Sequence, residues 1–469
     1  MKTSTILLFI LSVFLIMGTI GYALPREGME VADATLTFPR ITDMLSADKP
    51  VMDSTQAFIH ANQMRTFMVT QRLSEELQRR LAVLRHKYAI NYPHDSIEWI
   101  YPVLAALDNA RNRPVRILHY GDSQIEIDRI TSDLRQSLMA RFGGYGVGLI
   151  PAIQTIPTTA IAQECDQPLT RFMAYGRDDM RSDTAYYGVL GQTALVDGST
   201  TFTFRATSMA KECTKKFGQI TLLTDLIERP LTITATAGSY SQTKTASRGT
   251  THIIFDLPDS TRQASLHIDG KGLIHAVLVD GKGNGLQYDN AAMRGCSGTI
   301  FTGIDPRSMA SYFGRYDVPL IILQYGGNVV PYVKTDKQIA DYCASLRRQI
   351  SYLRRLSPQS KILFIGPSDM ATNIDGKMQT YPSIPLLDDA LRQMCADTDV
   401  AYWSLYRAMG GKNSMTSWVN NQPALAGSDH VHFTPAGARH TAQMLLDAIY
   451  AAYDYYHQSL ENDEKQNTD

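Results

Sequence analysis

The chain has 469 residues, of which 44% are hydrophobic and 19% charged, with 45 Lys and Arg against 46 Asp and Glu. This length suffices for two or three domains, and the charge balance argues against a nucleic-acid binder, which usually carries a basic surplus. Five scattered cysteines without a CxxC pair argue against a disulfide scaffold and structural zinc, and Cys165 with Cys213 is the one disulfide pair to consider.

A short basic start and an apolar run open the chain. Lys2 precedes the run from Ile6 to Ile20, and small residues follow as far as Ala23. This order is typical of a secretory signal peptide, so we predict a signal segment over residues 1–23 and an exported protein, periplasmic or at the cell surface. An uncleaved N-terminal anchor is the alternative, because the run approaches the lower length limit of a membrane-spanning helix.

The next segments change from helical to mixed patterning. Residues 24–95 predict a helical N-terminal region, because apolar residues recur at helical spacing between Asp53 and Arg85. Residues 96–160 predict the first part of an α/β domain. Its expected elements are a helix over Ser96–Ala110, a strand over Val115–Tyr120 and a helix over Ile125–Phe142.

An all-β block interrupts this α/β domain. Residues 161–285 contain short runs rich in Thr, Ile, Val and Phe, separated by Gly, Asp, Pro and Ser, which predict an inserted antiparallel sandwich. Its expected strands are Thr200–Ala206, Gln219–Thr224, Leu231–Ala237, Thr251–Leu257, Ala264–Asp269 and Ile274–Val279, and Gly281–Gly285 is interpreted as a hairpin turn. Residues 286–455 return to alternating strands and helices, ending in a helix over Pro435–Tyr453, and 456–469 form a polar tail.

A serine follows the first strand of the α/β domain. In the segment HYGDSQ (residues 119–124), Ser123 is expected at the first turn of a helix, where N–H groups and the helix dipole favour developing negative charge. Ligands of α/β sheets collect at this carboxyl edge. Ser123 is therefore a candidate nucleophile. Helix capping by Asp122 or Ser123 is the alternative.

A serine nucleophile needs a base and a group that orients it. The segment SDHVHFTP (residues 428–435) supplies Asp429 and His432, three residues apart, just before the last helix. A tight turn can bring the carboxylate to Nδ1 of the imidazole and leave Nε2 for Ser123. A surface turn with incidental histidines is the alternative.

Two further segments offer donors for an oxyanion. The apolar strand LIILQ (residues 320–324) ends in Tyr-Gly-Gly-Asn, so the Asn328 amide is expected at the same sheet edge. In RGCSG (residues 294–298), Gly295 would let its backbone N–H approach a ligand closely. An ordinary turn at Asn328 and an ordinary loop glycine at Gly295 are the alternatives.

These four segments together resemble the SGNH hydrolases, also called the GDSL esterase/lipase superfamily. Its four blocks follow the same order, with Gln124 here where the family name has Leu. In this resemblance Gly295 fills the glycine block, with Gly298 as the alternative. Two departures concern neighbouring positions: Arg294 stands where relatives usually have Asn, and Gly327 where they have Thr or Gln.

Within the superfamily the chain looks most like bacterial peptidoglycan O-acetylesterases, some of which carry a β-sandwich between the first two blocks. The stretch FGGYGVGLIP (residues 142–151) is similar to theirs. The resemblance implies a three-layer αβα domain with a parallel sheet, interrupted by the sandwich. It also implies a serine esterase that removes O-acetyl groups from peptidoglycan or another envelope glycan, without a cofactor or a metal ion.

The resemblance assigns a role to each residue. Ser123 attacks the acetyl carbonyl, His432 acts as base and then acid, and Asp429 orients His432. The N–H groups of Ser123 and Gly295 and the Asn328 amide stabilise the oxyanion. Two other functions remain open: a polysaccharide O-acetyltransferase with the same triad, and a non-catalytic glycan-binding envelope protein. The expected partner is an acetylated glycan, without nucleic acid and without membrane contact beyond an N-terminal anchor.

Overall fold

The computed structural model of the chain describes residues 89–466, three isolated earlier positions and a short hairpin of β1 (Met29–Val31) and β2 (Ala34–Leu36). The hairpin lies in a first unit, Met1–Glu75, and residues 89–466 lie in a second, Glu76–Asp469. The predicted signal segment and the predicted Asp53–Arg85 helix lie outside the described residues. Among the described residues, no helix combines the length and apolar character needed to span a membrane.

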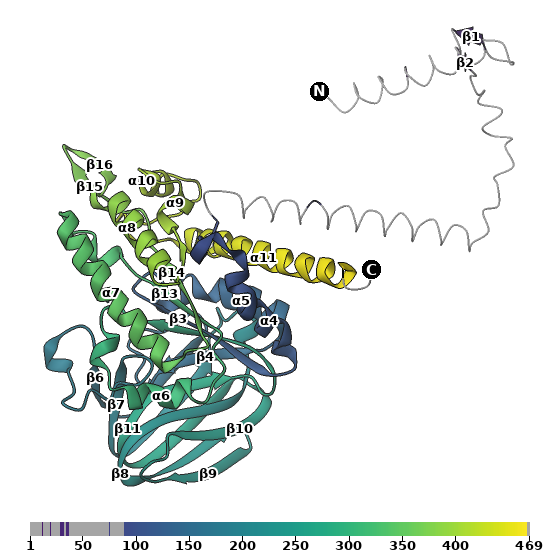
Figure 1. Cartoon of the computed structure of the whole chain (residues 1–469). Coiled ribbons are helices and arrows are strands. Elements are labelled where there is room, and N and C mark those ends of the chain that lie inside the picture. The colour runs from purple at the N-terminus through teal and green to yellow at the C-terminus, as the bar shows by residue number, and fades with distance from the viewer. Residues whose placement is uncertain are drawn as a thin grey trace, which may run out of the picture. The chain divides into compact units, whose positions relative to one another are not determined.

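Five parallel strands form the central sheet of the second unit (Figure 1). Their order is β12 (Gly285–Ala292), β3 (Pro114–Gly121), β13 (Leu320–Gln324), β14 (Lys361–Ile365) and β17 (Ala401–Trp403). The helices around it are α4 (Tyr101–Asp108), α5 (Thr131–Phe142), α6 (Pro306–Phe313), α7 (Asp336–Leu356), α8 (Ser383–Asp397), α9 (Leu405–Met409), α10 (Ser414–Val419) and α11 (Pro435–Gln466).

Alternate residues of these strands enter two different cores, as expected for a sheet buried on both faces. Ile117 and Ile322 pack with residues of α4, α5 and α11. Leu118 and Leu323 pack with residues of α7 and α8. The sheet is thus the middle of three layers, and the predicted αβα arrangement is confirmed.

The inserted block is one antiparallel sheet of eight strands. They are β4 (Gly146–Pro151), β5 (Ile161–Cys165), β6 (Thr170–Met173), β7 (Gln192–Ala206), β8 (Phe217–Ala237), β9 (Tyr240–Ala246), β10 (His252–Thr261) and β11 (Gln263–Asp280). The register between β8 and β11 shifts around residue 270. There a Cβ on Gly270 would lie 2.3 Å from the Pro230 carbonyl oxygen, so this close approach of the two strands requires glycine.

Several sequence predictions need correction here. Two pairs of predicted strands are each one long strand, β8 and β11, because the chain bends at the polar residues between them without leaving the sheet. The sheet begins at β4, ahead of the predicted boundary at 161, because β4 pairs with β11. The predicted hairpin turn at 281–285 instead joins two different sheets. The last helix continues beyond Tyr453 to Gln466. All five cysteines are free, so a Cys165–Cys213 disulfide is excluded.

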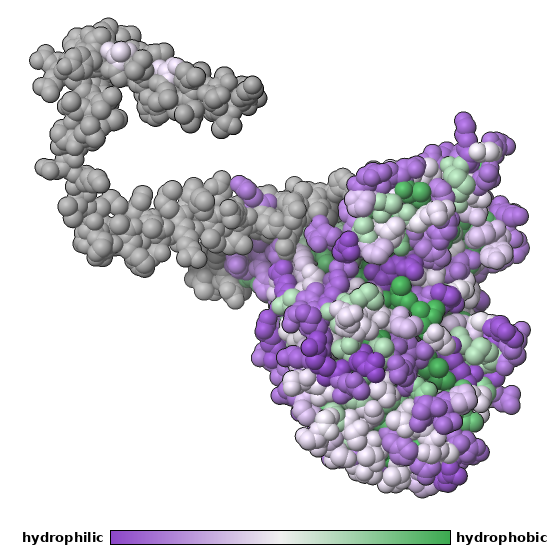
Figure 2. Space-filling model, turned by 180° about the vertical axis from the view of Figure 1, so that it is seen from behind, coloured by the Kyte–Doolittle hydropathy of each residue, from purple (hydrophilic) through white to green (hydrophobic). Residues whose placement is uncertain are grey.

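The second half of β11 joins the two modules. Ala276 and Leu278 belong to the core beneath α7 and α8, whereas Val277 and Val279 belong to the core of the antiparallel sheet. This part of β11 is therefore buried on both faces. One face packs in the core of the antiparallel sheet, and the other packs in a core of the α/β domain. The face of the second unit that is turned away from the viewer in Figure 1 carries hydrophobic residues only in small patches on a mostly hydrophilic surface (Figure 2).

A buried arginine lies at this junction. Arg116 of β3 is 4% exposed, and its guanidinium donates to both oxygens of Asp280 at the end of β11 (2.8 and 3.1 Å) and both oxygens of Asp289 in β12 (2.7 and 2.8 Å). Asp289 also accepts from the N–H of Leu149 in β4 (2.8 Å) and from the hydroxyl of Tyr312 in α6. Arg116 therefore links strands of both sheets.

Replacing Arg116 by Met should destabilise the protein by about 3–5 kcal/mol, because two carboxylates would stay buried without their counter-ion. Urea unfolding of the full chain measures this free energy. Arg177→Met removes an arginine whose ion pair with Asp179 is exposed, and it should leave the unfolding free energy nearly unchanged. Equal stability of Arg116→Met and the wild type would contradict the role assigned to this junction.

Candidate active site

The predicted site residues gather at one edge of the central sheet. β12, β3 and β13 are neighbouring parallel strands, so their carboxyl ends lie side by side. Ser123 follows the end of β3, Gly295 the end of β12 and Asn328 the end of β13. His432 reaches the same edge from the loop that precedes α11.

Ser123, His432 and Asp429 form a continuous hydrogen-bonded chain. The Ser123 Oγ lies 2.9 Å from Nε2 of His432, and Nδ1 of His432 lies 2.7 Å from Oδ2 of Asp429. The other Asp429 oxygen accepts from the backbone N–H groups of Val431 and His432, each at 3.0 Å. These two bonds fix the carboxylate within its own turn, and the turn aims the imidazole at Ser123.

The turn after Ser123 differs from the prediction. The expected helix from Ile125 begins only at Thr131, so Ser123 does not lie in the first turn of a helix. Ile127 and Asp128 adopt left-handed conformations (φ 57° and 64°), which interrupt any helix. Asp128 is held there because both of its oxygens accept from the buried Arg135 guanidinium (2.9 and 3.0 Å). Helix-dipole stabilisation at Ser123 is therefore excluded.

Asp122 positions Asn328, a role that the sequence did not reveal. Asn328 Nδ2 donates to Oδ2 of Asp122 (2.8 Å) and to the carbonyl oxygen of Cys296 (3.1 Å), while Oδ1 of Asp122 accepts from the Gln124 N–H (2.9 Å). Asp122 therefore caps no helix. In the resting site both amide hydrogens of Asn328 are engaged, and the longer bond to a neutral carbonyl is the weaker one.

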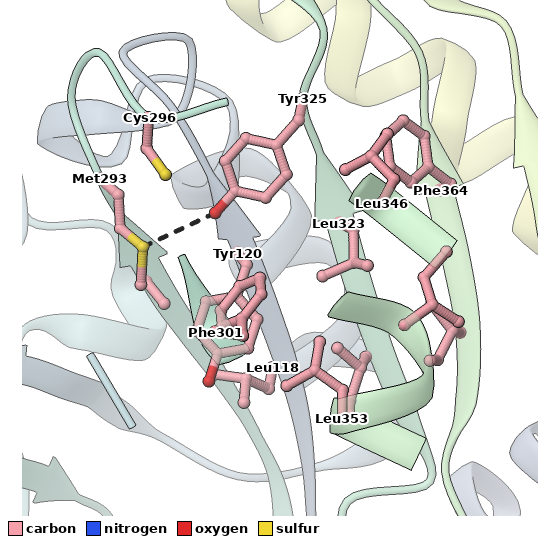
Figure 3. Packing of buried hydrophobic residues seen from close by; sticks show 14 of the residues in the cluster. Leu118, Tyr120, Met293, Cys296, Phe301, Leu323, Tyr325, Leu346, Leu353 and Phe364 are labelled. Carbon is pink, nitrogen blue, oxygen red and sulfur yellow. Dashed lines mark hydrogen bonds between the residues drawn. The ribbon is translucent and has the colours of Figure 1, made fainter. Parts of the chain in front are cut away.

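The two candidate glycines have different surroundings. Gly295 is exposed at a φ of 73°, and a Cβ there would meet open space. The N–H of Gly298 donates to Sγ of Cys296 (3.3 Å), and a Cβ there would lie 2.6 Å from the Tyr325 ring. Figure 3 shows the Tyr325 ring beside Cys296, with its hydroxyl directed at Met293. Gly298 thus packs against Tyr325, and Gly295 is the more exposed of the two glycines, although it does not line the pocket described below.

Gln124 ties the serine turn to the histidine loop. Its Nε2 donates to the carbonyl oxygen of Val431 (2.7 Å), the residue next to His432. The sequence marked Gln124 only as a departure from the family name. The residues around Gln124 in the sequence could not have indicated this bond, because its partner, Val431, is 307 residues away along the chain.

Burial has opposite consequences for the two aspartates of the site. It raises the pKa of Asp122 to about 6, although the Gln124 N–H, His432 and Asn328 each lower it. Burial also opposes ionisation of Asp429, but the bonds from the His432 side chain and from two backbone N–H groups outweigh it, so the pKa of Asp429 lies below its usual value. Asp429 is thus a carboxylate whenever it faces His432 at neutral pH.

A pocket of about 190 Å³ opens over the triad. Ser123, His432 and Asn328 line it together with the apolar Met370 and with Tyr332, which is 74% exposed at the rim. A polar nucleophile beneath a partly apolar pocket suits attack on a small acyl group.

Comparison with known proteins agrees with this geometry. Residues 269–440 match the GDSL-like Lipase/Acylhydrolase family. The matched range contains Gly295, Asn328, Asp429 and His432, and Ser123 precedes it. The predicted resemblance to GDSL hydrolases, and with it the assignment to the hydrolases, is confirmed.

One solved structure shares the fold over most of the chain, and others match with low TM-scores. A peptidoglycan O-acetylesterase is 20% identical with a TM-score of 0.62, over 76% of this chain and 95% of that one. An acetyl xylan esterase is 17% identical with a TM-score of 0.27, over 35% and 81% of the two chains. A family two carbohydrate esterase from Cellvibrio japonicus is 10% identical with a TM-score of 0.24, over 63% and 99%. No curated protein sequence matches the chain.

Replacing Gln124 by Leu should lower turnover of an aryl acetate about 5- to 30-fold, with little change in KM. The bond to the Val431 carbonyl is worth about 1–2 kcal/mol, and its loss loosens the loop that aims His432. Gln349→Leu is the matched control, because Gln349 is buried and hydrogen-bonded to Thr302 elsewhere in the fold. A loss of kcat in both variants would mean that Gln124 acts only through stability.

Replacing Asp122 by Asn should change how stability depends on pH. Because the pKa of Asp122 rises from 3.8 to about 6 on burial, its contribution to stability is complete below pH 3.8 and is lost as the pH rises through 6. The loss corresponds to roughly 3 kcal/mol. Since Asn cannot ionise, the Tm of Asp122→Asn relative to wild type should rise between pH 4 and 7, as measured by thermal unfolding.

Asp305→Asn provides the control for this experiment. The bond to Arg307 lowers the pKa of Asp305, so the contribution of the Asp305 carboxylate to stability is lost only in more acidic solution. The difference in Tm between Asp305→Asn and the wild type should therefore stay constant above pH 5. If the Tm of Asp122→Asn and the Tm of the wild type changed with pH in the same way, the conclusion that Asp122 ionises while buried would be wrong.

Proposed function

We propose that the protein is an exported serine esterase that removes O-acetyl groups from a glycan of the cell envelope. The observation that carries the proposal is the Ser123–His432–Asp429 chain, with contacts of 2.9 and 2.7 Å, beneath a pocket at the carboxyl edge of the sheet. Export is proposed from the signal-like segment over residues 1–23.

The first half of the reaction acylates the serine. The acetyl carbonyl carbon is attacked by Ser123 Oγ while Nε2 of His432 accepts the hydroxyl proton, and the Asp429 carboxylate stabilises the resulting imidazolium. As the tetrahedral intermediate collapses, the carbon–oxygen bond to the sugar breaks and the imidazolium gives its proton to the sugar oxygen. The products are the free sugar hydroxyl and an acetyl-serine.

Three donors are proposed for the developing oxyanion: the N–H groups of Ser123 and Gly295 and the Asn328 amide. Asn328 must exchange its bond to the Cys296 carbonyl for one to the oxyanion, while its bond to Asp122 keeps the amide in place. This exchange replaces a neutral acceptor by a charged one only when the intermediate forms, so it stabilises the transition state more than the ground state.

The second half returns the enzyme to its resting state. Water replaces the sugar hydroxyl, His432 removes one of its protons, and the resulting oxygen attacks the acetyl carbonyl. Collapse of the second tetrahedral intermediate breaks the bond to Ser123 Oγ, which recovers its proton from His432. Acetate leaves, and no other reactant is needed.

A sugar is the proposed leaving group because of the surroundings of His432. The leaving oxygen must lie within reach of Nε2, and the same pocket carries the exposed ring of Tyr332 at its rim. An aromatic ring with a polar tip suits a sugar, which presents apolar C–H faces as well as hydroxyl groups. The shared fold with a peptidoglycan O-acetylesterase supports peptidoglycan as the first glycan to test.

Replacing Ser123 by Ala should abolish acetate release from O-acetylated peptidoglycan and from an aryl acetate, because no nucleophile remains. Acetate release is measured on the chain from Leu24 onward, and thermal unfolding checks the fold. Ser199→Ala is the matched control, because Ser199 also contacts a histidine, His267 (3.4 Å), but on the exposed antiparallel sheet. This control should keep full activity.

Two outcomes would overturn the proposal. Full activity of Ser123→Ala would exclude Ser123 as the nucleophile. Acetyl transfer to an added sugar without net release of acetate would identify the protein as a transferase with the same triad.

A further inference from the structure

A second cavity, of about 270 Å³, lies beside the active-site pocket. Its walls come from both modules: the turn after Ser123, the end of β12, β4 with the loop after it, β6 and the start of β7. At the end of β3, Gly121 pairs with Ala292 of β12 on one side and with Gln324 of β13 on the other. Ala292 lines this cavity and Gln324 lines the active-site pocket, so the two hollows flank the strand that presents Ser123.

The charges that line the cavity do not cancel. Two acids are matched by two arginines: Asp128 by Arg135 (2.9 and 3.0 Å) and Glu126 by Arg294 (2.6 Å). Arg171 is the fifth charged residue of the lining, and within the part of the chain that the structure describes it has no acidic partner. The cavity therefore has a surplus of one positive charge.

The guanidinium of Arg171 is held in place and keeps free donors. Its Nε and Nη2 donate to Oε1 of Gln192 (2.9 and 2.6 Å), and Nε2 of Gln192 donates to the Tyr175 hydroxyl (3.3 Å). A guanidinium has five N–H donors, of which Gln192 accepts two and the neighbouring Tyr175 hydroxyl a third, so two stay available for a ligand. Gln192 and Tyr175 are both buried, so they fix the orientation of the arginine in advance.

The rest of the lining is largely apolar. Ile127, Ile150, Ile153, Met173 and Leu190 belong to it. Apolar walls strengthen the attraction between a cation and an anion because they exclude water. They also offer a surface for the C–H face of a sugar ring.

The turn that separates the cavity from Ser123 is rigidly built. Ile127 has a φ of 57°, which a β-branched residue rarely adopts, and its carbonyl oxygen accepts from the Thr159 N–H (3.4 Å) of the cavity loop. The next residue, Asp128, is anchored by Arg135 and by Nδ2 of Asn290 (2.9 Å). The cavity is thus fixed relative to the nucleophile.

From these observations we infer that the second cavity binds a carboxylate-bearing unit of the acetylated glycan, with Arg171 as its ion partner. The carboxylate would accept paired hydrogen bonds from Nη1 and Nη2, a geometry that arginine provides and lysine does not. This inference rests on the proposed function for the nature of the chain that carries the unit, and it narrows the substrate to acidic glycans. A sugar acid and a peptide stem attached to the sugar are two sources of the same group.

Direct binding tests this inference apart from catalysis. Calorimetric titration of Ser123→Ala uses two probes, trigalacturonic acid and a peptidoglycan disaccharide-peptide, each before and after its carboxyl groups are converted to amides. At least one acidic probe should bind, and its amide should bind about 10- to 100-fold more weakly. The probe that binds identifies the source of the carboxylate.

Variants of the arginine complete the experiment. Adding Arg171→Met to Ser123→Ala should weaken binding of the acidic probe to the level of its amide, and Arg171→Lys should recover only part of the affinity. Arg205→Met is the matched control, because Arg205 lies on β7, where it contacts Gln263 (3.3 Å) and the exposed Glu164 (4.0 Å), and lines neither hollow. Thermal unfolding checks that each variant folds.

The outcomes separate this inference from the proposed function. Failure of both acidic probes to bind, or equal binding by Arg171→Met, would overturn the carboxylate site even if the wild type releases acetate. Binding that depends on Arg171, in a protein whose wild type releases no acetate, would uphold the site and reject the esterase.

Discussion

The contact of Arg116 with Asp280 and Asp289 determines how the two sheets meet, and the site depends on that meeting. Asp280 ends the antiparallel strand β11, Asp289 lies in the parallel strand β12, and the guanidinium between them belongs to β3. Five residues beyond Arg116, the same strand ends at Gly121 and delivers Ser123. An ion cluster buried in this way specifies geometry more than it adds stability. It sets where the inserted sheet stands relative to Ser123, and with it the walls of the second cavity, which both modules supply.

A second constraint is the buried carboxylate of Asp122. Burial raises the pKa of this group, which means that its charged form costs folding free energy at neutral pH. The cost is offset in function, because a charged Asp122 holds the Asn328 amide through a bond of 2.8 Å and leaves its other hydrogen on a weaker acceptor. Active sites commonly retain such unfavourable groups where a donor must be oriented before the reaction begins. Burial of the Asp122 carboxylate thus lowers the stability of the fold and at the same time holds the Asn328 amide in a fixed orientation.

Much of this could be predicted from the sequence, because periodic patterns and short blocks are local. The β-rich run over Val115–Tyr120 and the apolar run at 320–324 predicted two strands of the buried parallel sheet. The four blocks predicted which side chains meet at one edge. The left-handed turn at Ile127 and Asp128 could not be predicted, because it depends on contacts of Asp128 with Arg135 in α5 and with Asn290, far along the chain. A local pattern favoured a helix there, and tertiary contacts prevented it.

The distinction between what a sequence pattern shows and what tertiary contacts decide applies to charge as well. A net charge of −1 for the whole chain argued against a nucleic-acid binder, but a sum over 469 residues carries no information about where individual charges lie. Exposed charges are screened within about 8 Å at physiological salt, whereas a charge among apolar walls is screened far less. In the second cavity, Asp128 is cancelled by Arg135 and Glu126 by Arg294, so the field there is set by Arg171. An unpaired group of this kind is visible only once the partners of its neighbours are known. The positions of the charged side chains, and not the composition of the chain, therefore decide which ligand this cavity favours.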